Sequence, residues 1–383
     1  MKIKQVNVYV VDTGSYQLVM AESITDEGIS GIGEAAVGYG IGSAAAAVMI
    51  KELADAFVIG RDPFNITDIW NDFYYHTFWG KAGGAIFYAA VSALEMTLWD
   101  IKGKALGVPV YQLLGGKQRD EVRVYANDIF GVETPAEFAK RAEEVVCDGY
   151  DMIKIYPLNQ KDPRRNINGH IKNRYLERET EERGYEIIRE VRRAIGDKVE
   201  LLIDVTCEAT IDVMIRIGKK LEQYHPFWYE EPADPFDLEA YRDIKEKLNV
   251  PIAGGERIYT KFGHIKLIET RGVDIVQPDP GTCGGIGEVW HIGVMAEAAG
   301  MRIAPHNCGG PVLTAAAVQL SAALSNYVCQ EVFPYRPDIH YAVVKNPLEK
   351  EIKNGRLKVP EREGLGVELN HQVADKFQVA RCV

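Results

Sequence analysis

Six polar residues recur at regular intervals in the second half of the chain, each at the end of a short apolar run. They are Asp204, Glu230, Glu256, Asp279, His306 and Glu331, and successive members lie 23 to 27 residues apart. That interval is about the length of one strand-and-helix unit, so we expect each residue to end one strand of a parallel barrel. The carboxyl ends of barrel strands meet at one mouth, where the active groups of barrel enzymes lie.

The first three of these residues are carboxylates, and their chemistry requires a cation. Close like charges at low dielectric repel one another strongly unless a positive charge compensates them. Ligation by oxygen alone favours Mg²⁺, with Mn²⁺ as the alternative, over zinc. A divalent ion on a substrate carboxylate would make the adjacent carbon more acidic. Taken singly, Asp204 could instead cap a helix and Glu230 could belong to a solvated turn, but the shared spacing favours ligands.

The remaining groups suggest proton transfer. Asp279 and His306 end neighbouring strands, where a carboxylate can orient an imidazole and stabilise its charge. Lys154 and Tyr156 point to the same side of the strand MIKIY, because side chains alternate with a period of two. Either could be the second proton carrier, since a nearby ammonium favours the phenolate of a tyrosine. The alternative is a salt bridge for Lys154 and packing for Tyr156.

Eight apolar runs alternate with amphipathic stretches from about Val122 onward. Eight strands alternating with helices are the count of a closed parallel (β/α) barrel, which we place at 122–346. The runs are VRVYAND, MIKIYP, VELLIDV, FWYEEP, PIAGGE, DIVQPD, RIAPH and YVCQEV. Residues 1–121 begin with antiparallel strands and continue as helices, which predicts an α+β unit. The tail, 347–383, contains the strand-like segments GRLKVP and GLGVELN and is expected to return to that unit.

A long polar segment interrupts the alternation between the second run and the third. Its sequence is PLNQKDPRRNINGHIKNRYLERETEERG, and an insertion after a barrel strand usually lies over the active site. Its basic residues, Arg165 among them, could attract the second anionic group of a diacid. Because the segment also carries five acidic residues, a solvated lid is the alternative.

Composition excludes several classes of partner. The formal net charge of -11 argues against a polyanion such as nucleic acid. No run of about 18 uncharged apolar residues is present, and the first 20 residues lack the pattern of a secretory signal, so we expect a cytoplasmic protein without a membrane partner. Six scattered cysteines, without a CxxC pair, predict reduced thiols and no sulfur-based metal site.

Several stretches together resemble the enolase superfamily, in its mandelate racemase subgroup, and their pattern is close to that of sugar-acid dehydratases of the galactonate type. The matching stretches are ITDEGISGIGEA, SALEMTLWDIKGKALGVPVYQLLGG, IDV, WYEEP, AGGER, VQPD, APHNCGGP, CQE and GLGVELN. The resemblance covers nearly the whole chain. It implies a modified TIM barrel of the (β/α)7β type, with an α+β capping domain formed by residues 1–121 and the tail.

The family's roles then fall on particular positions of this sequence. The resemblance implies Mg²⁺ ligands at Asp204, Glu230 and Glu256, an acid/base dyad at Asp279 and His306, and a hydrogen-bond donor to the substrate carboxylate at Glu331. The loop FYYHTFWGKAGG (73–84) is similar to the family loop that closes over substrate. Trp79 and His76 are its candidate substrate contacts, and aromatic core packing is the alternative for both.

Two positions depart from the family pattern. Lys154-Ile155-Tyr156 stands where many relatives have Lys-x-Lys, and Thr206 stands where galactonate-type relatives often have a histidine. A tyrosine beside a cationic residue resembles the base of some sugar-acid dehydratases. The acid that expels the leaving hydroxyl is therefore expected to be His306 or Tyr156.

These observations predict a hydro-lyase that converts an aldonate or aldarate into a 2-keto-3-deoxy acid. The base removes the α-proton, the metal stabilises the enediolate, and the acid expels the β-hydroxyl. A racemase or epimerase, and a cycloisomerase, are alternatives on the same fold. A regulatory protein that binds sugar acids without turning them over is the alternative outside catalysis. The family also implies a symmetric homo-oligomer.

Overall fold

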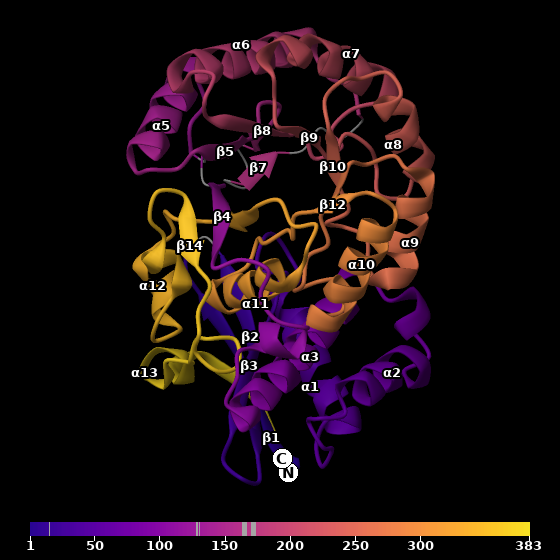
Figure 1. Cartoon of the computed structure of the whole chain (residues 1–383), viewed down its shortest axis with the longest axis vertical. Coiled ribbons are helices and arrows are strands. Elements are labelled where there is room, and N and C mark those ends of the chain that lie inside the picture. The colour runs from indigo at the N-terminus through magenta and orange to yellow at the C-terminus, as the bar shows by residue number, and fades with distance from the viewer. Residues whose placement is uncertain (15, 128, 130, 163–166, 170–173) are drawn as a thin grey trace.

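The computed structural model describes residues 1–14, 16–127, 129, 131–162, 167–169 and 174–383. Within these ranges the N-terminal segment forms one layered unit and a parallel barrel stands beside it, with both chain termini close together at the far end of the N-terminal unit (Figure 1). Arg165 of the polar insertion lies outside the described residues. No helix in the described ranges has the length and apolarity that crossing a membrane requires.

The N-terminal unit is a four-stranded antiparallel sheet covered by helices. The strands run in the order β15-β1-β2-β3. They are β1 (Ile3–Asp12), β2 (Gln17–Thr25), β3 (Ser30–Ala35) and β15 (Gln378–Cys382), and the helices are α1 (Ser43–Phe57), α2 (Ile66–His76), α3 (Ala85–Leu106) and α4 (Val110–Leu113), with η1 (Gly80–Ala82). Helix α3 lies so close to β3 that a Cβ at Gly33 would come within 1.9 Å of the Ala93 carbonyl oxygen. Only glycine allows this approach.

The barrel consists of eight parallel strands. They are β4 (Glu121–Ala126), β5 (Met152–Ile155), β8 (Glu200–Asp204), β9 (Trp228–Glu230), β10 (Ile252–Gly254), β11 (Ile275–Val276), β12 (Arg302–Ile303) and β13 (Gln330–Val332). The hydrogen-bonded order is β12-β11-β10-β9-β8-β5-β4-β13. A parallel bridge between Ile303 and Tyr327 links β12 to the segment that enters β13, and this bridge closes the ring.

Seven helices connect these strands and surround the barrel in the described ranges. They are α5 (Pro135–Cys147), α6 (Arg178–Ile195), α7 (Ile211–Leu221), α8 (Leu238–Lys245), α9 (Thr260–Thr270), α10 (Ile286–Ala298) and α11 (Pro311–Ala323). The start of α5 follows local rules, because it has a capping box between Thr134 and Glu137 and a proline in its first turn. Eight strands and seven helices confirm the predicted (β/α)7β barrel.

Short elements complete the chain. They are β6 (Gln160–Asp162), β7 (Ile167–Gly169), η2 (Glu222–Tyr224), α12 (Asp338–Ala342), η3 (Leu348–Glu351), β14 (Arg356–Lys358), α13 (His371–Ala374) and η4 (Asp375–Phe377). The two strand-like parts of the tail behave differently. Strand β14, from GRLKVP, pairs antiparallel with β4 of the barrel, whereas the backbone N–H of Leu365, in GLGVELN, donates to Asp100 of α3. The tail then ends as β15 against β1.

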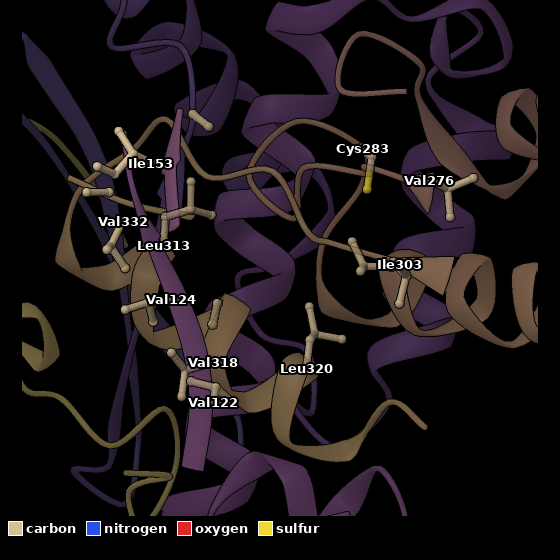
Figure 2. Close-up of a cluster of buried hydrophobic side chains, with 14 of the residues drawn as sticks. Val122, Val124, Ile153, Val276, Cys283, Ile303, Leu313, Val318, Leu320 and Val332 are labelled. Atoms are coloured by element: carbon tan, nitrogen blue, oxygen red, sulfur yellow. The ribbon is translucent and has the colours of Figure 1, made fainter. Parts of the chain in front are cut away.

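Two sets of apolar side chains hold the barrel together. The outward-facing set packs against the helices, and Figure 2 shows Val122, Val124 and Val332 of the strands with Leu313 and Leu320 of α11 in one buried cluster. Burial contributes roughly 1.5–3 kcal/mol for each side chain of this size. The inward-facing set forms a separate layer with about one residue from each strand: Tyr125, Met152, Leu202, Trp228, Ala253, Ile275, Ala304 and Cys329.

Candidate active site

A polar layer lies directly above the apolar floor of the barrel. Two residues beyond each floor residue, the side chain of a strand faces the interior again. The positions reached in this way are Asn127, Lys154, Asp204, Glu230, Gly255, Gln277, His306 and Glu331. All of them except the glycine are buried polar or charged residues. Strand alternation therefore places a ring of polar groups at the carboxyl end of the barrel.

Three carboxylates of this region form a compact donor set. One oxygen of each of Asp204, Glu230 and Glu256 lies within 4.8 Å of the others. Burial raises the pKa of Asp204 well above its usual value, and the charge of Glu230 raises it further. Burial likewise raises the pKa of Glu256. Three carboxylate oxygens this close together, two of them from groups whose charged form burial disfavours, fit a hard divalent ion such as Mg²⁺.

Neighbouring groups orient these carboxylates. The indole N–H of Trp228 donates to Oε2 of Glu230 at 2.7 Å, and the backbone N–H of Thr206 donates to Oδ1 of Asp204 at 2.9 Å. Hydrogen bonds of this kind fix the direction of a ligand's lone pairs. Thr206, at the position where galactonate-type relatives often have a histidine, thus orients Asp204 through its backbone.

Lys154 lies within the carboxylate cluster. Its Nζ is 2.8 Å from Oε1 of Glu230, 2.8 Å from Oε1 of Glu331 and 3.5 Å from Oδ2 of Asp204. Burial alone would lower the pKa of Lys154, but the charges of Glu230 and Glu331 hold it well above its usual value. The ammonium is therefore a fixed positive charge that partly neutralises the cluster.

Asp279 and His306 form the hydrogen-bonded pair that the sequence predicts. Nδ1 of His306 lies 2.6 Å from Oδ2 of Asp279, and Nε2 lies 3.2 Å from Oε2 of Glu256. Burial favours the neutral ring, but the charges of Glu256 and Glu331 and the bond to Asp279 outweigh it and raise the pKa of His306 to about 10. An imidazolium held in this way can donate a proton from Nε2.

Tyr156 and Asn127 complete the polar groups beside the cluster. The amide of Asn127 donates to the Tyr156 hydroxyl oxygen at 2.8 Å and to Oε1 of Glu331 at 2.5 Å. Burial raises the pKa of Tyr156 well above its usual value, and the charge of Lys154, 5.6 Å from the ring centre, opposes that rise. Asn127 is not among the predicted site residues, although it is the next-to-last residue of the run VRVYAND and lies two residues beyond a floor residue, as the other polar groups do.

Glu331 is an acceptor in this arrangement. It accepts hydrogen bonds from Asn127 and from the backbone N–H of Asn307 at 2.9 Å. Burial would raise its pKa, but Lys154 and His306 lower the pKa below its usual value. The ionised carboxylate differs from the hydrogen-bond donor implied by the resemblance, and that donor role stays a prediction.

A pocket opens onto these groups from the side of the N-terminal unit. Its lining residues are Tyr16, Tyr39, Asn127, Tyr156, Asn159, Asp204, Thr206, Glu256, His306, Cys308 and Phe333. Tyr16 and Tyr39, from the N-terminal unit, have ring centres 5.9 Å apart. Sequence reasoning missed both tyrosines, because their approach depends on how the two units dock. Tyr156 lines the pocket, whereas Lys154 is fully buried and is not among the lining residues.

The other candidate substrate contacts lie elsewhere in the described structure. Trp79 is 72% exposed and lines a surface groove with α1 and the start of α3. His76 ends α2, where its Nδ1 lies 2.7 Å from Oδ1 of Asp72. Neither side chain is among those that line the pocket. Their part in substrate binding stays a prediction, as does that of Arg165.

Comparison with known proteins gives consistent matches along the chain. D-Gluconate dehydratase of Thermoproteus tenax is 33% identical over 94% of this chain and 69% of its own. D-Galactonate dehydratase of Ralstonia pickettii is 33% identical over 90% of this chain and 87% of its own. D-Xylonate dehydratase of Haloferax volcanii is 32% identical over 99% of this chain and 89% of its own.

Solved structures agree with these relatives. A protein from Mesorhizobium loti matches with a TM-score of 0.95 and 42% identity over 100% of both chains. An enolase superfamily member from Salmonella Typhimurium matches with a TM-score of 0.92 and 34% identity over 100% of both chains. Residues 3–115 match the mandelate racemase/muconate lactonizing enzyme N-terminal domain, and residues 137–373 match the family described as enolase C-terminal domain-like. The chain therefore belongs to the enolase superfamily, with the mandelate racemase/muconate lactonizing enzyme type of capping domain.

Proposed function

We propose that the protein is a sugar-acid dehydratase that converts an aldonate or aldarate into a 2-keto-3-deoxy acid. The observation that carries the proposal is one pocket lined by Tyr156, by His306 of the dyad and by the carboxylates Asp204 and Glu256. Two proton carriers and a metal-binding edge are what removal of an α-proton and loss of a β-hydroxyl require. The dehydratase relatives support this choice among the reactions that one such site could perform.

Each group has an assigned part in the reaction. A divalent ion bound by Asp204, Glu230 and Glu256 would supply positive charge beside the substrate carboxylate. Tyr156 is assigned as the base that takes the α-proton, because the Asn127 amide and the Lys154 ammonium both stabilise a phenolate.

The acid of the reaction is assigned to the dyad. His306 donates a proton to the departing β-hydroxyl, which leaves as water while the electron pair of the broken C–H bond forms the new double bond. Asp279 holds the ring through Nδ1 so that Nε2 points toward the carboxylate cluster. The enol product then ketonises to the 2-keto-3-deoxy acid.

A substrate screen tests this proposal. Purified protein with Mg²⁺ is incubated with a panel of mono- and diacid sugars, and the keto acid is read as its semicarbazone. We expect turnover of at least one sugar acid and its loss with chelator or in Asp204→Asn. If no keto acid forms while the α-proton exchanges with D₂O, the protein is a racemase or epimerase instead. If neither occurs across the panel, the catalytic proposal is wrong.

A further inference from the structure

The two members of the dyad have similar surroundings along the chain. Each lies three residues after the end of a barrel strand and is followed by a short loop rich in glycine and then by a barrel helix. Asp279 precedes α10 through the residues PGTCGG, and His306 precedes α11 through NCGG. Loops of this composition have little intrinsic stiffness. The positions of both catalytic side chains therefore depend on what holds these loops.

Glu34, at the end of β3 in the N-terminal unit, holds the loop that carries His306. Its Oε1 accepts the backbone N–H of Gly310 at 2.5 Å, and its Oε2 accepts that of Leu313 at 3.0 Å. Both donors belong to the start of α11, where free backbone N–H groups and the helix dipole favour a negative charge. The carboxylate thus fixes α11 four residues after His306.

Glu95, on α3 of the same unit, holds the loop that carries Asp279 in the same way. Its two oxygens accept the backbone N–H groups of Ile286 and Gly287, each at 2.8 Å, at the start of α10. A Cβ at Gly285 would lie 2.2 Å from Oε2 of Glu95, so only glycine leaves space for this carboxylate.

Further contacts tie the Asp279 loop to the N-terminal unit. The backbone N–H of Ala36, two residues after Glu34, donates to the Gly281 carbonyl at 3.0 Å. The backbone N–H of Gly284 donates to the Ser92 hydroxyl at 2.9 Å, and its carbonyl accepts the indole N–H of Trp70 at 2.9 Å. Segments distant in sequence therefore meet at the two loops of the dyad.

Both carboxylates are buried without a cationic partner. Glu34 and Glu95 are each 1% exposed, and within the described part of the chain neither forms an ion pair with a lysine or arginine. Burial raises the pKa of each to about 7, although the backbone donors oppose this rise. Keeping two buried carboxylates costs stability that apolar side chains would not cost. This loss of stability is expected where the buried carboxylates are needed to fix the geometry of a functional site.

We infer that Glu34 and Glu95 are positioning residues, through which the N-terminal unit sets the geometry of the Asp279–His306 dyad. The role of the dyad in turnover rests on the proposed function, but its geometry can be measured without turnover. The N-terminal unit then has two tasks: it covers the pocket with Tyr16 and Tyr39, and it fixes the two loops that hold the proton-transfer pair.

The test compares Glu34→Gln and Glu95→Gln with the control Glu22→Gln. Glu22 is also a buried glutamate of the N-terminal unit, but it bonds Asn7 and Tyr9 and reaches neither loop. Protein labelled with ¹⁵N in its eight histidines gives the imidazole resonances, and His306→Gln identifies the signal of His306. We expect both loop variants, and not Glu22→Gln, to shift the His306 ring signals.

Turnover gives a second readout where a substrate is known. A displaced dyad should lower kcat by up to ~10²-fold with KM roughly unchanged, because substrate contacts remain while the reacting groups are misplaced. If the His306 signals of both loop variants match those of Glu22→Gln, the inference is wrong, whatever the reaction proves to be. Should Glu34→Gln not fold, Glu95→Gln alone decides, since it acts on the other loop. Shifted His306 signals in the loop variants, together with no turnover of any sugar acid by the wild type, would contradict the proposed function and support the positioning role.

Discussion

Nζ of Lys154 lies 2.8 Å from Oε1 of Glu230. The sequence predicts this lysine either as a second proton carrier or as a salt-bridged barrel residue; its contacts are salt bridges, and its part in proton transfer stays a prediction. Its ammonium is fully buried and also contacts Glu331 and Asp204. Since it is fully buried and does not line the pocket, its charge acts on the carboxylates and on the phenol of Tyr156, whose ring centre is 5.6 Å away.

Replacing this lysine should destabilise the protein strongly. Lys154→Met leaves Glu230 buried without its positive partner and Glu331 with only the more distant His306, and removal of one member of a buried pair typically costs ~3–5 kcal/mol. Urea unfolding in the presence of chelator measures this loss. Lys266→Met, at an exposed position on α9, is the control and should change the unfolding free energy by less than ~0.5 kcal/mol. A loss of unfolding free energy as small as that of the control would mean that the lysine does not stabilise the buried carboxylates.

Mg²⁺ should stabilise the wild type and leave the stability of Asp204→Asn almost unchanged. The wild type should gain about 2.7 kcal/mol of unfolding free energy at a Mg²⁺ concentration 100 times the Kd. Asn at this position removes a repelling charge whose burial raises the pKa of Asp204, so the variant should be no less stable than the wild type in chelator. It should gain little from Mg²⁺. Thermal unfolding at increasing Mg²⁺ concentrations measures both gains. An equal gain in stability for the two proteins would exclude Asp204 as a ligand.

The positions of Asp204 and Glu230 are predictable because they follow from two regular spacings, whereas Glu256 comes one residue after the interior position of its strand. One βα unit separates the strand ends, and the period of two turns every second side chain toward the barrel interior. Asn127 could have been found by the same rule. The pocket wall formed by Tyr16 and Tyr39 could not, because it depends on how the N-terminal unit docks, which no local pattern encodes.

Two further features were not predictable from local sequence patterns. GIGEA was noted as a matching stretch, yet the contact between Glu34 and α11 joins residues 276 positions apart. The strand GRLKVP was recognisable as a strand, but its pairing with β4 was not, because an alternating pattern does not specify its partner. Local periodicity therefore predicts elements and the direction of side chains, whereas contacts between units require the assembled fold.

The two proton carriers should separate the two halves of the reaction. Tyr156→Phe removes the assigned base, so both α-proton exchange in D₂O and keto-acid formation should fall by ~10²–10⁴. His306→Gln removes the assigned acid, so keto-acid formation should fall by a similar factor while exchange continues. Tyr39→Phe, on the other wall of the pocket, is the control and should change KM more than kcat. If His306→Gln stops exchange and Tyr156→Phe does not, the base and acid assignments are reversed.

His264 should make the stability of the protein sensitive to acid. The ring is buried on α9, and its Nδ1 lies 3.0 Å from the Thr260 carbonyl. Burial lowers the pKa of His264 to about 4 from the usual 6.5. Above pH 6.5 the ring is neutral in both the folded and the unfolded state, so its contribution is complete there. As the pH falls from 6.5 toward 4, the unfolded chain binds a proton that the folded chain does not, and up to ~3 kcal/mol of stability is lost.

Urea unfolding between pH 5 and pH 8 measures this effect by comparison with His264→Gln, which has no titrating ring at this position. The stability of the wild type relative to the variant should decline as the pH falls, with the steepest change below pH 6.5. His291→Gln, at an exposed position on α10, is the matched control and should follow the wild type. A difference between wild type and His264→Gln that does not change with pH would show that the buried ring accepts a proton as readily as a solvated one.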